Sequence, residues 1–312
     1  MKNKVLTGLL LVLIGGWGSL SAQNVGSNYA RQVNTLIGTK GVGLTSGYLY
    51  PGATYPYGMV QFTPSYFSKR SGFVINQLSG GGCEHMGNFP TFPVKGKLKM
   101  SPDNILNYRI NISEEKGHAG YYEAKVQEDI HAKLTVTERT GMASYEYPAD
   151  QQYGTVIIGG GISATPIEQA AIVITAPNKC EGYAEGGNFC GLRTPYKVYF
   201  VAEFDTDALE SGTWKRDELK PNTTFAEGEY SGVYFTFDVN KKKNIQYKIG
   251  VSYVSVENAR ENLKTENSGW DFLQIQNQAE SKWNHYLGKI EVEGSNPDRT
   301  TQFYTHLYRS FI

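Results

Sequence analysis

The sequence predicts a mostly β fold, a large antiparallel β-sandwich followed by a short helical linker and a further helix. Three observations lead to this fold class. From about residue 105 to residue 256, short segments alternate apolar and polar side chains, and turn-forming residues separate them. No segment with helical periodicity lies between these strands, which favours a two-sheet sandwich. From residue 268 onward, the apolar spacing changes from two residues to three or four.

The first 22 residues have the features of a signal peptide. Lys2 and Lys4 precede an apolar stretch from Val5 to Leu20, and Ser19–Ala22 offers small residues for cleavage. Glycines interrupt the apolar stretch, so it is too short for a membrane span. We therefore expect an exported chain, periplasmic or secreted, whose mature part begins at residue 23.

The remaining chain is close to neutral and strongly aromatic. Without the two lysines of the leader, 28 basic residues stand against 30 acidic ones, a net charge near −2. No charge run or basic stripe indicates a nucleic-acid partner or an anionic membrane surface. The 22 Tyr, 14 Phe and 4 Trp suit both packing on half-buried sheets and stacking on sugar rings. Composition leaves both uses open.

Two glycine-rich blocks, residues 37–64 and 72–93, are too rich in Gly and Pro for a helix or a regular strand. Compact domains usually keep such long irregular loops for function. One interpretation is that they close one end of the β structure. The other is a ligand-facing loop, which the sequence Cys83-Glu84-His85 after three glycines favours.

Three cysteines in an exported chain suggest one disulfide. Cys180 and Cys190 flank an apparent glycine-rich loop, so the sequence predicts that they pair. Such a bridge would stabilise the fold by about 3 kcal/mol. Cys83 is left over, as a buried small residue, a free thiol lining a pocket, or a nucleophile.

The expected strands follow in order along the chain. They are 131–140 (HAKLTVTERT), 154–160 (GTVIIGG), 170–175 (AAIVIT), 197–205 (KVYFVAEFD), 233–239 (VYFTFDV) and 245–256 (IQYKIGVSYVSV). In the first, Ala132, Leu134 and Val136 share one face, and polar residues take the other. The segments 154–160 and 197–205 are continuously apolar, as strands buried on both faces would be.

One glycine motif requires rejection. VIIGGGISA at 156–164 matches the dinucleotide fingerprint, with Gly159, Gly161 and Ala164 in the spaced positions. That chemistry needs a helix whose N-terminus faces the pyrophosphate. Pro166 and the strand 170–175 leave no room for such a helix, so we expect none.

Two helices are expected near the carboxyl end. Ser268 with Asp271 resembles a capping box, and Gly288 marks the end of the first helix. Its expected apolar face comprises Phe272, Ile275, Ala279, Trp283, Tyr286 and Ile290. Asn296-Pro297 then supplies an N-cap and a first-turn proline for the second.

The second helix carries Phe303, Leu307 and Phe311 on one face and reaches Ile312 without a C-cap glycine. This predicts an apolar face with nothing to pack on, a truncated chain, and a helical domain that follows. The alternative is a last helix that docks on the sandwich.

Six ordered blocks resemble the N-terminal region of glycoside hydrolase family 92. They are Val33–Thr39 (V-N-x-x-I-G-T), Tyr50–Gln61 (F-P-G-A-T-x-P-F-G-M-V-Q), Leu78–Cys83 (L-S-G-x-G-C), Leu134–Gly141 (L-T-x-T-x-R-x-G), Ser255–Leu263 (S-V-E-x-A-x-x-N-L) and Phe303–Tyr308 (F-Y-T-A-L-Y). The resemblance covers nearly all of the mature chain.

The resemblance implies an exported, calcium-dependent exo-α-mannosidase that inverts anomeric configuration, with a β-sandwich, a helical linker and an (α/α)₆ barrel. The implied division is 1–22 signal peptide, 23–256 sandwich, and 257–312 linker with the start of the catalytic barrel. Inversion needs two carboxyl groups about 6.5–9.5 Å apart, and in this family they lie on the barrel. Glu203 and Asp205 share one strand face here, but a solvated sheet edge explains them better.

The family's interdomain loops correspond to Thr39–Gly43 and Ser79–His85, which would wall the mannose pocket. The substrate-binding candidates are Gly41, Gly43, Ser79, Gly82, Cys83, Glu84 and His85. This chain departs from the family pattern at Thr45–Tyr48 and Val74–Gln77, so the resemblance does not fix the sugar.

Two functions of different classes follow. In the first, the chain is the non-catalytic half of a secreted α-mannosidase that trims mannose-containing glycans, with the catalytic domain missing. It would then hydrolyse no mannoside alone, and calcium would belong to the full-length enzyme. In the second, it is a free-standing secreted carbohydrate-binding protein.

Overall fold

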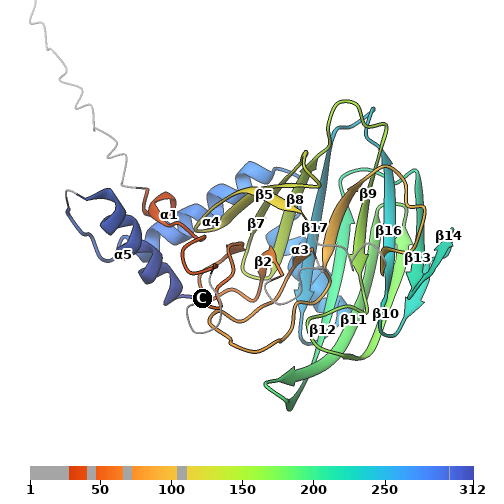
Figure 1. Ribbon diagram of the computed structural model, residues 1–312, viewed down its shortest axis with the longest axis horizontal. Coiled ribbons are helices and arrows are strands. Elements are labelled where there is room, and N and C mark those ends of the chain that lie inside the picture. Colours follow the sequence, from red (N-terminus) through yellow and green to blue (C-terminus); the bar gives the residue numbers. More distant parts are fainter. Residues whose placement is uncertain (1–27, 41–46, 66–71, 104–110, 295) are drawn as a thin grey trace, which may run out of the picture.

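The computed structural model describes residues 28–40, 47–65, 72–103, 111–294 and 296–312 (Figure 1). The predicted signal peptide and the candidates Gly41 and Gly43 lie outside these ranges. Among the described residues, two antiparallel sheets form the fold, with eight and nine strands. The predicted antiparallel sandwich is therefore confirmed.

The eight-stranded sheet has the spatial order β1-β2-β3-β4-β9-β16-β13-β14. Its strands are β1 (Ala53–Thr54), β2 (Gln61–Pro64), β3 (Phe73–Val74), β4 (Thr91–Lys95), β9 (Tyr153–Gly159), β13 (Glu210–Lys215), β14 (Glu218–Pro221) and β16 (Ser231–Asp238).

The nine-stranded sheet has the order β15-β10-β11-β12-β17-β8-β7-β6-β5. Its strands are β5 (Ile112–His118), β6 (Tyr121–Val126), β7 (Ile130–Val136), β8 (Thr140–Glu146), β10 (Ile167–Ala176), β11 (Lys179–Phe189), β12 (Leu192–Phe204), β15 (Phe225–Glu227) and β17 (Asn244–Ser252). Each of the six expected segments contains a strand, although the strand in 131–140 ends at Val136 and the strand in 245–256 ends at Ser252.

The aromatic residues fill the space between the sheets. Tyr247 lies at the centre, where its ring centroid is 5.3 Å from that of Phe204 and its hydroxyl accepts a hydrogen bond from Thr91. Tyr122, Tyr145 and Phe73 are likewise fully buried. The hydroxyls of Tyr247 and Tyr122 keep polar partners while their rings pack, which suits a core of facing sheets, whereas the Tyr145 hydroxyl has no hydrogen-bond partner among the described residues. Much of the high tyrosine content thus serves packing.

The rejected dinucleotide motif spans the end of β9 and the irregular connection to β10, and no helix lies there. A Cβ at Gly161 would stand 1.9 Å from the Gly228 carbonyl oxygen. The glycine is therefore required by close backbone packing within the sandwich.

Helix α3 (Val256–Glu266) was not among the helices that the periodicity predicts. The expected strand 245–256 ends at Ser252, and the Ser255 side chain caps α3 by accepting from the Asn258 N–H at 3.1 Å. The helix lays Ala259 and Leu263 on Val201 of the nine-stranded sheet. Two apolar contacts and a serine cap are too weak a pattern for the spacing analysis to detect.

The other two helices match the prediction with two corrections. Ile290, expected on the apolar face of the first, lies beyond the end of that helix and is exposed. Helix α4 (Phe272–Leu287) is capped by Asp271, whose Oδ1 accepts from the Gln274 N–H at 2.9 Å, and not by Ser268. It ends at Gly288 as expected. Helix α5 (Pro297–Arg309) begins after the predicted cap Asn296.

A second core joins the helices to the sandwich. The indole N–H of Trp283 on α4 donates to the Thr54 carbonyl at 2.7 Å, and the Tyr308 hydroxyl on α5 bonds the Thr54 side chain at 2.6 Å. Short helix α1 (Tyr29–Gln32) completes this core with Ala30. Figure 1 shows α1 and α5 at the end of the molecule opposite β14.

The expectation that α5 has nothing to pack on is wrong. Tyr304 and Tyr308 are fully buried, and the predicted face of Phe303, Leu307 and Phe311 packs half-buried around the same core. Within the described ranges, no helix is both long and apolar enough to span a membrane.

Candidate functional site

The described candidate residues lie in one loop between β3 and β4. Gly82 and Glu84 are exposed, Ser79 and Cys83 are half-buried, and His85 is 3% exposed. The loop therefore offers the backbone around Gly82 and the Glu84 carboxylate to a ligand. His85 faces inward.

His85 organises the loop from within. Its Nε2 accepts from the Leu78 N–H at 2.7 Å, and its Nδ1 lies 2.6 Å from the Cys83 carbonyl oxygen. A carbonyl can only accept, so this network assigns the proton of the neutral ring to Nδ1. Phe189 packs edge-on against the ring at 5.7 Å. The predicted part of His85 in sugar binding stays untested, but both of its ring nitrogens are held by backbone groups.

The three glycines of the loop, at positions 80, 81 and 82, differ in why glycine is needed there. Gly80 has φ +75°, and its N–H donates to the Tyr48 carbonyl at 3.0 Å. A Cβ at Gly81 would lie 2.8 Å from Cε1 of His85. A Cβ at Gly82 would meet only the Tyr48 ring, at 3.8 Å, which is ordinary contact. Packing among the described residues explains Gly81, and backbone geometry explains Gly80, but neither explains Gly82.

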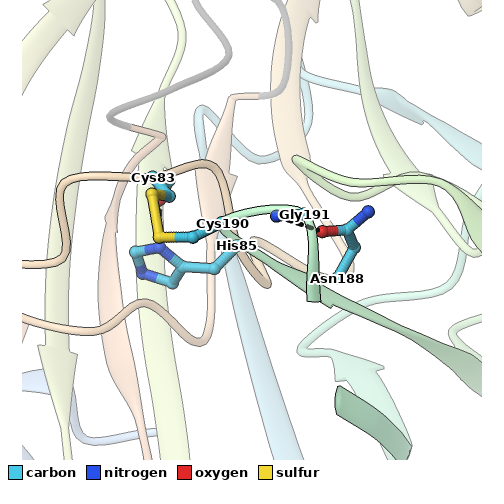
Figure 2. The surroundings of a disulfide bond; sticks show 5 residues. All are labelled: Cys83, His85, Asn188, Cys190 and Gly191. Atoms are coloured by element: carbon cyan, nitrogen blue, oxygen red, sulfur yellow. Dashed lines mark hydrogen bonds between the residues drawn. A yellow bond between two sulfur atoms is a disulfide. The ribbon is translucent and has the colours of Figure 1, made fainter. Parts of the chain in front are cut away.

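The predicted disulfide between Cys180 and Cys190 is wrong. Cys190 pairs with Cys83, whose Cα lies 5.2 Å away (Figure 2), and Cys180 is a buried free thiol. The segment between Cys180 and Cys190 is strand β11. At about 3.3 Å per residue, an extended strand holds its ends roughly 30 Å apart, far beyond disulfide reach. All three roles considered for Cys83 are thus also wrong.

The turn between β11 and β12 delivers Cys190 to the loop. Cys190 and Gly191 have φ of +53° and +82°, as a tight hairpin turn of the primed type requires. The Gly191 N–H donates to Oδ1 of Asn188 at 3.0 Å, as Figure 2 shows. The turn geometry therefore fixes the direction in which the Cys190 side chain leaves the hairpin.

Glu203 and Asp205 are held in ion pairs. Strand β12 lies inside its sheet between β11 and β17, so the expected solvated sheet edge is wrong. Glu203 is 2.9 Å from Nζ of Lys179 and 3.6 Å from Nζ of Lys248. Asp205 is 2.7 Å from Nζ of Lys242. Both carboxylates are therefore paired with lysine side chains that are held on or beside the same sheet.

Sequence reasoning missed a buried acidic site at Glu280. Its carboxylate lies 3.1 Å from Nε of Arg31, 2.7 Å from Nε2 of Gln276 and 3.3 Å from Nε2 of His118. Burial acts to raise the pKa of Glu280, but the hydrogen bonds from Arg31 and Gln276, together with the charges of His118 and Arg31, outweigh it, so the pKa lies below its usual range. The cluster fastens α4 to α1 and β5. Only tertiary structure brings these residues together.

An open, shallow hollow of about 750 Å³ lies along the exposed side of α4. Its lining residues are Tyr55, Asp271, Leu273, Gln274, Asn277, Gln278, Ser281, Lys282 and His285. None belongs to the Ser79–His85 loop. Among the described residues, no three His, Cys, Asp or Glu side chains gather as a metal site. The described residues therefore present no carboxylate cluster of the kind that would hold the calcium implied by the family resemblance.

Comparison with known proteins gives a consistent result. Residues 32–252 match the glycosyl hydrolase family 92 N-terminal domain, and residues 258–312 match the catalytic domain of the same family. An uncharacterized secreted glycosidase of Arthroderma benhamiae is 26% identical over 343 residues, which cover 97% of this chain and 44% of the relative.

Two solved structures from Bacteroides thetaiotaomicron are similar to this fold. A family 92 α-mannosidase superposes with a TM-score of 0.79 at 24% identity, over 91% of this chain and 41% of its own. A family 92 inverting mannosidase gives a TM-score of 0.76 at 24% identity, over 91% and 39%. The chain thus spans less than half the length of these relatives.

Proposed function

We propose, because the chain belongs to glycosyl hydrolase family 92, that it forms the N-terminal, non-catalytic part of an exported enzyme that removes terminal α-mannosyl residues from glycans. The match over residues 32–252 carries the proposal. The mannosidases named among the similar folds support the sugar, and the relative described as secreted supports export.

The contribution of this chain is to bind and orient the sugar. The exposed Glu84 carboxylate accepts hydrogen bonds from sugar hydroxyls, and the backbone at Gly82 allows a ring to approach closely. Inverting hydrolysis needs a carboxylic acid and a carboxylate on opposite sides of the scissile bond. Glu203 and Asp205 are instead held in ion pairs with lysines, which speaks against such a role for them. We therefore assign the acid, the base and the calcium ligands to parts of the enzyme outside this chain.

The test compares the enzyme expressed from its complete reading frame with its Glu84→Ala variant on an aryl α-mannoside. We expect kcat/KM to fall about tenfold, equivalent to about 1.4 kcal/mol of transition-state binding. The melting temperature should stay within a few degrees, because Glu84 lies outside the core. Glu227→Ala, at an exposed position on β15, is the matched control and should change neither quantity.

Separate outcomes decide separate parts of the proposal. A wild-type enzyme that hydrolyses no α-mannoside would overturn the function, and mannose binding without turnover would favour a carbohydrate-binding protein. Unchanged kinetics in Glu84→Ala would remove this loop from the sugar site. Turnover by the 312-residue chain alone, lost on mutation of one of its residues, would overturn its non-catalytic role.

A further inference from the structure

The Ser79–His85 loop is fastened at three points. The Cys83–Cys190 disulfide spans 107 residues and ties the loop to the β11–β12 hairpin. The Gly80 N–H ties it to the chain at Tyr48. His85 closes the loop on itself, because its two ring nitrogens bridge the backbone of Leu78 and Cys83.

The hairpin that holds the disulfide is itself paired as far as its turn. Strands β11 and β12 pair up to Phe189 and Leu192, next to the turn, with one register shift between Gly186 and Asn188. The Phe189 ring packs against His85 from the same hairpin that carries Cys190. Figure 2 shows the His85 side chain beside the disulfide. The disulfide and the Phe189–His85 contact therefore both come from the β11–β12 hairpin.

Gly82 and Glu84, on the Ser79–His85 loop, are exposed. Both residues are direct neighbours of Cys83 in the chain. The disulfide therefore fixes the residue between the two candidate sugar-binding residues. A loop held in its bound shape loses less conformational freedom when a ligand binds, and its affinity is higher for that reason. The Cys83–Cys190 bond thus restrains the backbone at the position between Gly82 and Glu84.

We propose that the Cys83–Cys190 disulfide and His85 are positioning residues, which hold Gly82 and Glu84 in the sugar-binding shape before the sugar arrives. This inference rests on the proposed function for its ligand. The hydrogen bonds of His85 hold the local shape of the loop, and the disulfide holds the loop in position relative to the nine-stranded sheet. Without the disulfide, the loop keeps its local turn but can move relative to the sheet.

The first test measures backbone hydrogen exchange in residues 78–86. Compared with the oxidised wild type, the Cys190→Ser variant should exchange at least tenfold faster there, with no change in β9 of the sandwich core. A phosphine reductant should reproduce the effect in the wild type, since the disulfide gains two electrons and two protons while the phosphine takes oxygen from water. It should have no effect on Cys190→Ser. Unchanged exchange in both samples would overturn the positioning role.

The second test measures steady-state kinetics of the full-length enzyme on an aryl α-mannoside. A positioning role raises KM about tenfold in Cys190→Ser and leaves kcat within twofold, because the loop binds ground and transition states alike. A merely structural role would lower the active fraction, and so kcat, at constant KM, which would overturn the proposal.

The matched control for both tests is Cys180→Ala, which removes the buried thiol that forms no disulfide and should leave exchange in residues 78–86 and KM unchanged. An inactive wild type would refute the proposed function and, with it, the sugar as ligand. The exchange experiment would still decide whether the disulfide positions the loop.

Discussion

Replacement of Trp283 by Phe tests how the helices are held to the sandwich. Trp283 is fully buried, its ring centroid is 4.6 Å from that of Tyr308, and its indole N–H donates to the Thr54 carbonyl. Phenylalanine keeps an aromatic ring but removes three ring atoms, one of which is the donor nitrogen. Trp214 on β13 is the matched control, because it is also fully buried but its indole nitrogen has no hydrogen-bond partner among the described residues.

The expected magnitudes follow from these contacts. Removing three buried ring atoms costs about 2 kcal/mol at either position, by the scale of about 0.8 kcal/mol per buried methylene. At Trp283, loss of the donor to a buried carbonyl adds about 1–2 kcal/mol. For a chain of this size, each kcal/mol lowers Tm by about 2–3 °C. We expect Tm to fall by about 9 °C for Trp283→Phe and about 5 °C for Trp214→Phe.

The assay is thermal and urea denaturation followed by circular dichroism, with the free energy of unfolding taken from the urea curves. A difference between the two variants isolates the hydrogen bond to Thr54, since the loss of ring volume is common to both. Equal destabilisation, or no loss in either variant, would refute this reasoning about the second core.

Two further predictions concern single residues. Burial lowers the pKa of His118 below its usual range, and Arg31 adds to this while Glu280 and Glu123 oppose it. The folded state therefore binds this proton less well than the unfolded state, so stability is complete above about pH 6.5 and falls as the pH drops below it. His118→Gln should flatten the dependence of urea midpoints on pH between 7.5 and 5.5, and an unchanged slope would contradict the assignment. Gly161→Ala should destabilise by at least about 2 kcal/mol, because its Cβ would overlap the Gly228 carbonyl oxygen, whereas Gly269→Ala, with open space around it, should change stability by less than about 0.5 kcal/mol in the same denaturation assay.

Much of the fold could be predicted from sequence because the strands carry local signals. Segment 131–140 alternates, and β7 buries Ala132, Leu134 and Val136 as expected. The signals fail where a short element depends on distant partners. Helix α3 is held by Val201 and a serine cap, and α5 buries Tyr304 and Tyr308 instead of the more apolar face. In both helices, tertiary contacts outweigh the local pattern.

The candidate site shows the same limit more sharply. Glycine content made the segment between Cys180 and Cys190 look like a loop, yet it is a strand in which a Cβ at Gly182 would overlap the Ala171 carbonyl at 2.1 Å. Glycines that permit close strand packing cannot be told from loop glycines by composition. The inward role of His85 likewise depends on Leu78 and on a hairpin a hundred residues away.

The burial of Cys180 also bears on how this chain acquires its bridge. In an unfolded chain, Cys190 meets Cys180, ten residues away, more often than Cys83, which is 107 residues away. Loop-closure entropy favours the shorter ring by about 2 kcal/mol, roughly thirtyfold. Oxidation before folding therefore yields mostly the mispaired species, which cannot accommodate an extended β11 and must be reshuffled by thiol–disulfide exchange. Once β11 is paired and Cys180 is buried, burial raises the pKa of its thiol. Cys180 then forms little thiolate and no longer competes for Cys190. The order of sheet assembly and oxidation thus decides which disulfide a newly made molecule forms. Assembly first gives the Cys83–Cys190 bridge, and oxidation first gives the mispaired Cys180–Cys190 bridge.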